Sequence, residues 1–172
     1  MSTRTPRPTI PEPRETLLNG VLAFVREASA VRGVLRIALI GSLTTGKAVP
    51  KDADVLVTVA EDVDMPELAM LGRRLKGRSQ RINLGADIFL AGPAGNHIGR
   101  ICRHREPHFR VACKFRCGQV RFVCDDSENM TLAASLIREP PIDLWPKVIR
   151  RIAVPPDVER VLLSALEDSP AG

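Results

Sequence analysis

Apolar residues recur along the first half of the chain with two different spacings, and these spacings predict its secondary structure. Helical spacing from residue 14 to about 31 predicts an amphipathic helix, and residues 65–76 predict a second one. Compact apolar runs of strand length predict strands at 35–40, 53–59 and 84–90. The order helix, strand, strand, helix, strand predicts an α/β (α+β) fold, with a small mixed sheet flanked by helices.

Proline, glycine and the change of residue types divide the chain into four parts. Four prolines within residues 1–13 disfavour both helix and central strand, so this part is predicted to be a flexible arm. Residues 14–91 hold the predicted sheet and form the core domain. The remaining parts are a basic Cys/His-rich addition at 92–130 and a helical C-terminal tail at 131–172, with helices predicted at 131–137 and 156–166.

The composition narrows the classes of protein to which this chain can belong. It has 172 residues, 44% hydrophobic and 26% charged, which is ordinary for a globular domain with a buried core. Five Phe, one Trp and no Tyr argue against stacking of nucleobases on several aromatic rings. The net charge of +5 is compatible with a polyanionic partner but does not require one.

The same sequence gives expectations about membranes and cellular location. No apolar run approaches the roughly 20 residues of a membrane span, so no membrane partner is expected. Residues 1–13 lack the apolar stretch of a signal peptide. Four Cys without such a signal favour reduced thiols, and the expected location is therefore the cytoplasm.

The most informative loop begins at Gly41, directly after the first predicted strand. Backbone N–H groups in such a turn can face phosphate oxygens. Residues 41–47 also fit the P-loop pattern of Gly, four residues, Gly and Lys. The following residue, however, is Ala48 where a P-loop needs Ser or Thr for magnesium, and Pro50 prevents the long helix that should follow. The P-loop interpretation is therefore disfavoured.

A second interpretation of this region rests on three acidic residues. Asp52 and Asp54 are two positions apart on a predicted strand, so their side chains leave the same face of the sheet, roughly 7 Å apart at the backbone. Asp87 is the single acid in another apolar strand. Three carboxylates on one sheet face repel one another unless cations neutralise them, and hard divalent ions suit oxygen ligands. Two magnesium ions about 3.5–4 Å apart could then activate a nucleophile and hold a leaving phosphate.

Together these features resemble the DNA polymerase beta-like nucleotidyltransferase superfamily, near its minimal nucleotidyltransferase branch. The shared pattern is an apolar strand, Gly41-Ser42, nine intervening residues, Asp52-Ala53-Asp54 and a later strand acid, Asp87. The resemblance covers about residues 14–91. It implies that Gly41 and Ser42 bind nucleotide phosphates, that Asp52 and Asp54 bind the metals, and that Asp87 completes a metal site and helps to deprotonate the attacking hydroxyl.

The loop departs from the superfamily pattern at one place. Relatives often carry Ala-Arg-Gly after Gly-Ser-x, whereas this chain has Thr44-Thr45-Gly46, so a phosphate-binding arginine is missing. Lys47 is the candidate to supply that charge, and the alternative is that it is a solvated loop lysine.

All four Cys and all three His lie between positions 97 and 124. One interpretation is a structural zinc site that stabilises a segment poor in apolar residues. The competing interpretations are buried thiols that act as small apolar side chains, and redox chemistry. The spacing lacks the Cys-x-x-Cys pair of zinc ribbons. The candidate zinc ligands are Cys102, His108, Cys113, Cys117 and Cys124.

The same segment is strongly basic, with Glu106 as the acid among seven Arg and Lys residues. This charge could hold the triphosphate or the phosphates of an RNA acceptor. It could equally be a solvated basic face. The basic residues are Arg100, Arg103, Arg105, Arg110, Lys114, Arg116 and Arg121.

The sequence therefore leaves two functional hypotheses. The first is a magnesium-dependent nucleotidyltransferase that moves a nucleoside monophosphate from a nucleoside triphosphate to an acceptor hydroxyl and releases pyrophosphate. The second is an inactive module of the same fold that binds nucleotide, RNA or a partner protein. Members of the superfamily modify antibiotics, proteins and RNA ends, so the resemblance does not name the acceptor.

Overall fold

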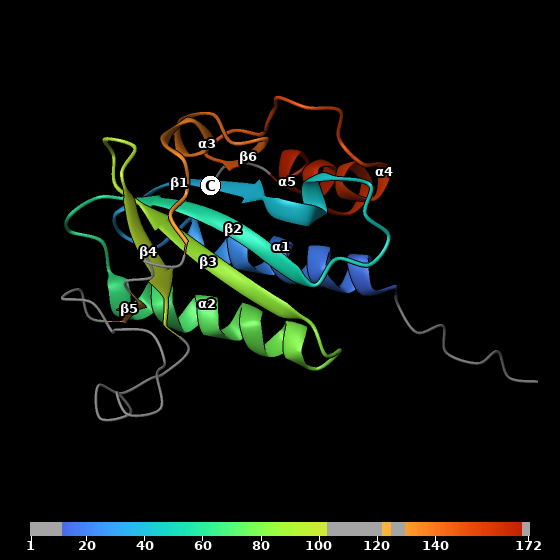
Figure 1. The fold of residues 1–172 in the computed structure, drawn as a ribbon, viewed down its shortest axis with the longest axis horizontal. Coiled ribbons are helices and arrows are strands. Elements are labelled where there is room, and N and C mark those ends of the chain that lie inside the picture. Colours follow the sequence, from blue (N-terminus) through green and yellow to red (C-terminus); the bar gives the residue numbers. More distant parts are fainter. Residues whose placement is uncertain (1–11, 103–121, 125–129, 170–172) are drawn as a thin grey trace, which may run out of the picture.

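The computed structural model of the chain describes residues 12–102, 122–124 and 130–169. These residues form a mixed sheet of seven strands in the order β5-β4-β3-β2-β1-β6-β7 (Figure 1). The predicted α+β class is confirmed. The strands are β1 (Val34–Ile40), β2 (Asp52–Val59), β3 (Gly85–Ala91), β4 (His97–Ile101), β5 (Val123–Cys124), β6 (Ile142–Trp145) and β7 (Ile149–Arg150).

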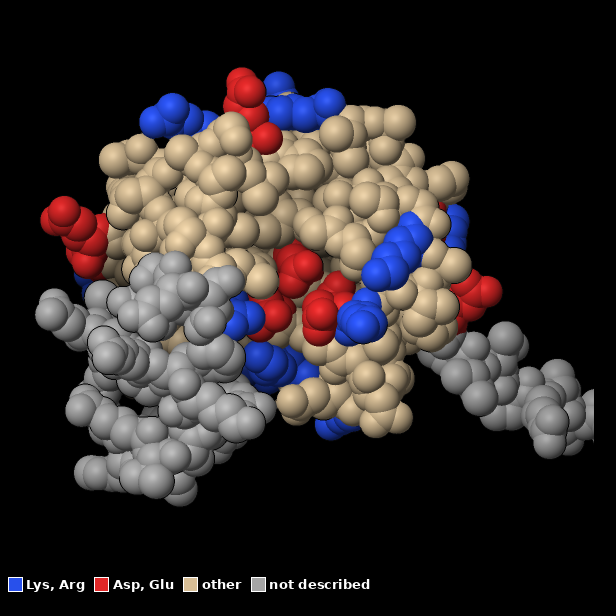
Figure 2. All heavy atoms as spheres, in the orientation of Figure 1, with Lys and Arg blue, Asp and Glu red and all other residues tan. Residues whose placement is uncertain are grey.

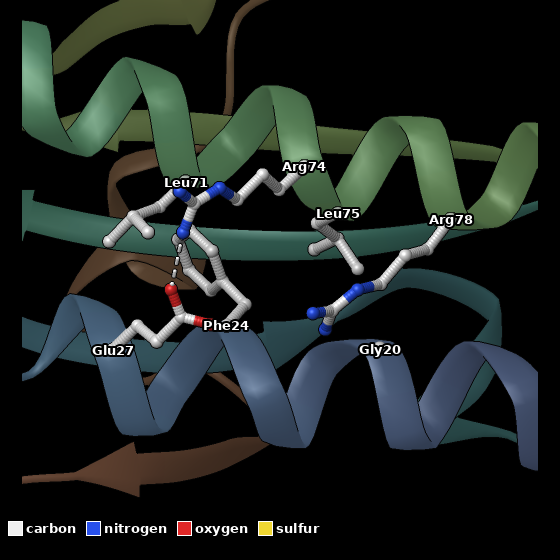
Figure 3. A pocket seen from close by; sticks show the side chains of 7 residues that line it. All are labelled: Gly20, Phe24, Glu27, Leu71, Arg74, Leu75 and Arg78. Atoms are coloured by element: carbon white, nitrogen blue, oxygen red, sulfur yellow. Dashed lines mark hydrogen bonds and ion pairs between the residues drawn. The ribbon is translucent and has the colours of Figure 1, made fainter.

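Two long helices, α1 (Pro13–Ala28) and α2 (Met65–Gln80), lie side by side on one face of the sheet (Figure 1). They approach closely at Gly20, where a Cβ atom would lie 3.0 Å from a methyl carbon of Leu75. At the same interface, Arg74 of α2 reaches over to Glu27 of α1, with 2.9 Å between Nη1 and Oε2 (Figure 3). The helices and the inner sheet face enclose the main aliphatic core.

The strands alternate between this core and the opposite sheet face, as the two-residue period of a strand requires. Val55 and Val57 of β2 point into the main core. Leu56 belongs instead to a smaller apolar cluster on the opposite face, which is partly covered by Ile137 of the short helix α3 (Ala134–Arg138). Asp54 has the same parity as Leu56 and therefore also belongs to the opposite face.

β2 and β3 form the parallel pair that positions the acids. Asp54 is the register partner of Asp87, and Asp52 is the partner of Gly85. Helix α2 makes the connection between the two strands, and Asp64 caps its start by accepting a hydrogen bond from the Glu67 amide at 3.1 Å. The other strand pairs among the described residues are antiparallel.

The C-terminal part differs most from the prediction. β6 lies beside β1 in the sheet, although no strand was predicted between the two helices of the C-terminal tail. The predicted helix at 131–137 is shorter and begins three residues later, as α3. The helix predicted at 156–166 is present as three continuous pieces: α4 (Pro156–Val158), the π-helical turn η3 (Glu159–Leu163) and α5 (Ser164–Glu167). The predicted arm and most of the Cys/His-rich addition lie outside the described residues.

Candidate active site

Asp52, Asp54 and Asp87 share one face of the sheet, as their sequence positions predict. Asp54 and Asp87 are directly opposite each other on neighbouring strands, and such strands lie about 4.8 Å apart. Asp52 lies two residues before Asp54 on the same side of β2. Figure 2 shows acidic side chains gathered near the centre of this face, with Lys and Arg side chains beside them. All three Asp are partly buried.

The turn at Gly41 directly adjoins Asp54. Ile40, the last residue of β1, pairs with Asp54 of β2, so the chain leaves the sheet next to this carboxylate. Gly41 has a φ of +72°, and a Cβ atom there would collide with Asp54 Oδ2. Only glycine adopts this conformation without strain and also leaves room for the carboxylate. The turn thus places Gly41 against the Asp54 carboxylate. Phosphate binding by Gly41 and Ser42 stays a prediction.

The two threonines that depart from the superfamily pattern stabilise this turn. Gly41 begins the 3₁₀ turn η1 (Gly41–Thr44), and the Thr44 hydroxyl donates to the Gly41 carbonyl at 2.7 Å. The Thr45 hydroxyl donates to the Ser42 carbonyl at 2.8 Å. After Lys47 the chain enters β2 without an intervening helix, which excludes the P-loop interpretation.

Gly85 is a site residue that the sequence analysis did not identify. It faces Asp52 across the parallel pair, and a Cβ atom at this position would collide with Asp52 Oδ1. A glycine that begins the strand carrying the third acid was the available signal, but its meaning depends on the register between β2 and β3.

The electrostatics of Asp54 reflect its crowded surroundings. Its pKa is raised from 3.8 to about 6, mainly because burial penalises the carboxylate, and then because Asp87 and Asp52 repel its charge. Arg100 partly offsets this effect. A nearby cation would therefore favour the ionisation of Asp54.

Asp87 is paired with two cationic side chains. Lys76 Nζ lies 3.4 Å from Asp87 Oδ1, and Arg100 Nη1 lies 3.3 Å from the same oxygen. Arg100 extends from β4 over the ring of Phe89, with Cζ 5.8 Å from the ring centroid. Arg100 belongs to the basic segment noted in the sequence, whereas Lys76 on α2 was not identified, because its proximity to Asp87 depends on how the helix packs.

Lys47 is placed on the exposed part of the loop. Its backbone carbonyl accepts a hydrogen bond from Arg14 at 2.8 Å. Among the described residues, no contact joins its side chain to the three acids, so both interpretations of this lysine stay open.

Two of the candidate zinc ligands, Cys102 and Cys124, are described by the structure. Both are buried, and Cys124 belongs to β5. Burial of this kind agrees with thiols that pack as small apolar side chains. His108, Cys113 and Cys117 lie outside the described residues, so the zinc prediction is not tested. In the ranges 12–102, 122–124 and 130–169, no three Asp, Glu, His or Cys side chains are arranged to hold a metal ion.

Comparisons with known protein families, with curated proteins and with solved structures find no match to this chain. Over the part of the chain that the structure describes, no helix has both the length and the apolar character needed to cross a membrane.

Proposed function

We propose that this chain is a magnesium-dependent nucleotidyltransferase that transfers a nucleoside monophosphate from a nucleoside triphosphate to an acceptor hydroxyl, with release of pyrophosphate. The observation that carries the proposal is the meeting of Asp52, Asp54 and Asp87 on one sheet face, beside the Gly41-Ser42 turn. The resemblance in sequence spacing supports the same activity. The acceptor is an RNA, a protein or a small molecule.

The donor set fits magnesium by its chemistry. All three side chains offer carboxylate oxygens, which hard divalent ions prefer. The raised pKa of Asp54 indicates that this carboxyl ionises with difficulty without an added cation. Among the described residues the three carboxylates are not arranged around a common metal position. Asp52, Asp54 and Asp87 would therefore hold the ions after Asp87 exchanges Lys76 and Arg100 for them. Bound ions would neutralise charge on the triphosphate and make the acceptor hydroxyl easier to deprotonate.

The chain's own residues would bind the substrate and move a proton. The turn at Gly41 and Ser42 would position the phosphates beside Asp54. Lys76 and Arg100, once they leave Asp87, would supply positive charge for the phosphate oxygens. Asp87 would take part in removing the proton from the acceptor hydroxyl. Most of the rate enhancement would then come from positioning and electrostatics.

The first prediction tests this proposal with labelled triphosphates. The purified protein is incubated with Mg²⁺, total cell extract and one labelled triphosphate at a time. Transfer of the label to a component of the extract and release of pyrophosphate are measured. We expect transfer by the wild type and a loss of about 1,000-fold or more for Asp54→Asn and Asp87→Asn, because each removes a carboxylate from the site. Asp62→Asn is the matched control, since Asp62 is exposed and pairs only weakly with Arg32 at 3.4 Å.

The outcome also distinguishes between the two functional hypotheses that the sequence analysis left open. Pairing of Asp87 with both Lys76 and Arg100 is the observation that favours the inactive module. Triphosphate binding with no pyrophosphate released, in the presence of every extract fraction, would support that module. Full activity of Asp54→Asn would show that the three acids are not the catalytic site.

A further inference from the structure

Arg14 lies almost buried under the loop that carries the Gly41-Ser42 turn. It is the second residue of α1, and its side chain is 11% exposed. Nη1 donates to the Lys47 carbonyl at 2.8 Å, and Nη2 donates to the Leu43 carbonyl at 3.1 Å. One planar guanidinium therefore binds two backbone carbonyls that lie on either side of the exposed tip of the loop.

The guanidinium is itself held by the C-terminal part of the chain. Asp157 of α4 accepts from Arg14 Nε at 2.6 Å and from Nη2 at 3.1 Å. The Arg14 hydrogen bond is also the main reason that the pKa of Asp157 is lowered. Val158, the next residue of α4, is fully buried in the main core. Helix α1, the loop and the C-terminal helices thus meet at a single side chain.

The contacts of Arg14 differ from those of Arg150, which also binds the C-terminal helices. Arg150 of β7 pairs with Glu159 and with Glu167, and both carboxylates belong to the tail itself. Within the described residues, its hydrogen bonds go to Glu159 and Glu167 and none goes to the loop. Arg14, in contrast, donates to two loop carbonyls at once, because its planar guanidinium presents several N–H donors in a fixed geometry.

We infer that Arg14, oriented by Asp157, is a positioning residue that holds the 41–47 loop in the conformation that binds triphosphate. The inference rests on the proposed function. Because the loop begins at Gly41, against the Asp54 carboxylate, a shift of its far end changes where the turn presents its N–H groups. A shift of about 1 Å is enough to weaken the binding of a ligand whose charged groups need fixed positions.

The second prediction compares Arg14→Met, Arg14→Lys and Asp157→Asn with the control Arg150→Met. Mg²⁺-ATP and Mg²⁺-GTP affinities are measured by calorimetry, each variant's Tm is recorded, and amide hydrogen exchange of the 41–50 segment is followed without nucleotide. We expect Arg14→Met to bind the triphosphate that the wild type prefers about 10-fold more weakly or worse, and its loop to exchange faster. Arg14→Lys should recover part of the affinity, because lysine keeps the charge but cannot reach all three partners.

Arg150→Met is expected to lower Tm but to leave triphosphate affinity within about twofold and loop exchange unchanged, since it lies apart from the loop. Unchanged loop exchange in both Arg14 variants would overturn the inference, as would equal losses of affinity in Arg150→Met and Arg14→Met. A wild type that binds no triphosphate would contradict the proposed function itself, and the exchange experiment would still decide whether Arg14 anchors the loop.

Discussion

Asp54 lies on β2 with Asp52 two residues before it and Asp87 opposite it on β3. Burial and these two neighbours raise its pKa to about 6, above the value of 3.8 expected in an unfolded chain. The folded protein therefore holds this proton more tightly than the unfolded chain does. Protonated Asp54 therefore contributes to the unfolding free energy. This contribution is fully present below about pH 3.8 and is lost as the pH rises through about 6.

The third prediction follows from this loss of stability with rising pH. In the presence of a chelator, raising the pH from 5 to 8 should cost the wild type about 1 kcal/mol of unfolding free energy through Asp54. Asp54→Asn should lack this contribution and be at least as stable as the wild type at pH 8. Urea denaturation of both proteins at the two pH values measures the difference. An identical pH dependence in the two proteins would mean that Asp54 is not under strain.

The fourth prediction concerns the glycine beside Asp54. Gly41→Ala should lower the unfolding free energy by about 1–3 kcal/mol, because alanine at positive φ is strained and its Cβ would collide with the carboxylate. Gly46→Ala in the same loop is the control, since no atom lies within 4 Å of a Cβ placed there. Thermal denaturation of both variants provides the comparison. Equal stability of the two would contradict the close approach of Gly41 to Asp54.

At the scale of elements, β6 is joined to β1 by a buried charge cluster as well as by backbone pairing. Asp143 of β6 is 3% exposed and accepts from Arg36 Nε at 2.6 Å and from Arg36 Nη2 at 3.0 Å. Arg151 adds a third bond, at 2.8 Å. Two arginines thus converge on one buried carboxylate, and each depends on it for charge compensation.

The fifth prediction is that Asp143→Asn destabilises the fold by about 3 kcal/mol, because the two guanidinium groups lose their shared counterion while still largely buried. Asp62→Asn, which breaks the exposed pair with Arg32, should cost less than about 1 kcal/mol. Chemical denaturation of both variants tests the contrast. A cost for Asp143→Asn as small as that for Asp62→Asn would show that the cluster does not secure β6.

The success of sequence prediction also depends on the element. β1, β2 and β3 lie within one residue of their predicted bounds, because each is a compact and mainly apolar segment of strand length. β6 was missed, because four residues between Pro141 and Pro146 carry little periodic signal and pair with a strand about 100 residues earlier. α2 extends four residues beyond its predicted end, to Gln80.

The candidate site shows the same division between local and long-range information. The sequence predicted that Asp52, Asp54 and Asp87 share a face and that the chain turns at Gly41. The contact of Gly41 with Asp54 was not predicted, because it depends on the register between β1 and β2. It did not predict Gly85, Lys76 or Arg14 as parts of the site. Gly85 is placed by the β2–β3 register, Lys76 by the packing of α2, and Arg14 by the approach of α4 to α1. A local sequence pattern predicts none of these three arrangements.

For the whole molecule, the site lies on the sheet face opposite α1 and α2, and the acids belong to central strands rather than to surface loops (Figure 1). The Gly41-Ser42 turn and the cationic partners of Asp87 come from other parts of the chain. The carboxylates are thus placed by backbone strand pairing, whereas the loop is held by side-chain hydrogen bonds from Arg14.

The parallel pairing of β2 and β3 affects how the protein unfolds on heating. Seven successive register pairs join the two strands, and the residues that alternate with the acids are buried in the main core. Central strands of this kind do not fray; they separate when the cooperative unit as a whole melts. The spacing between Asp54 and Asp87 should thus persist up to the melting transition, and any gradual change of the site below that temperature would arise outside this strand pair.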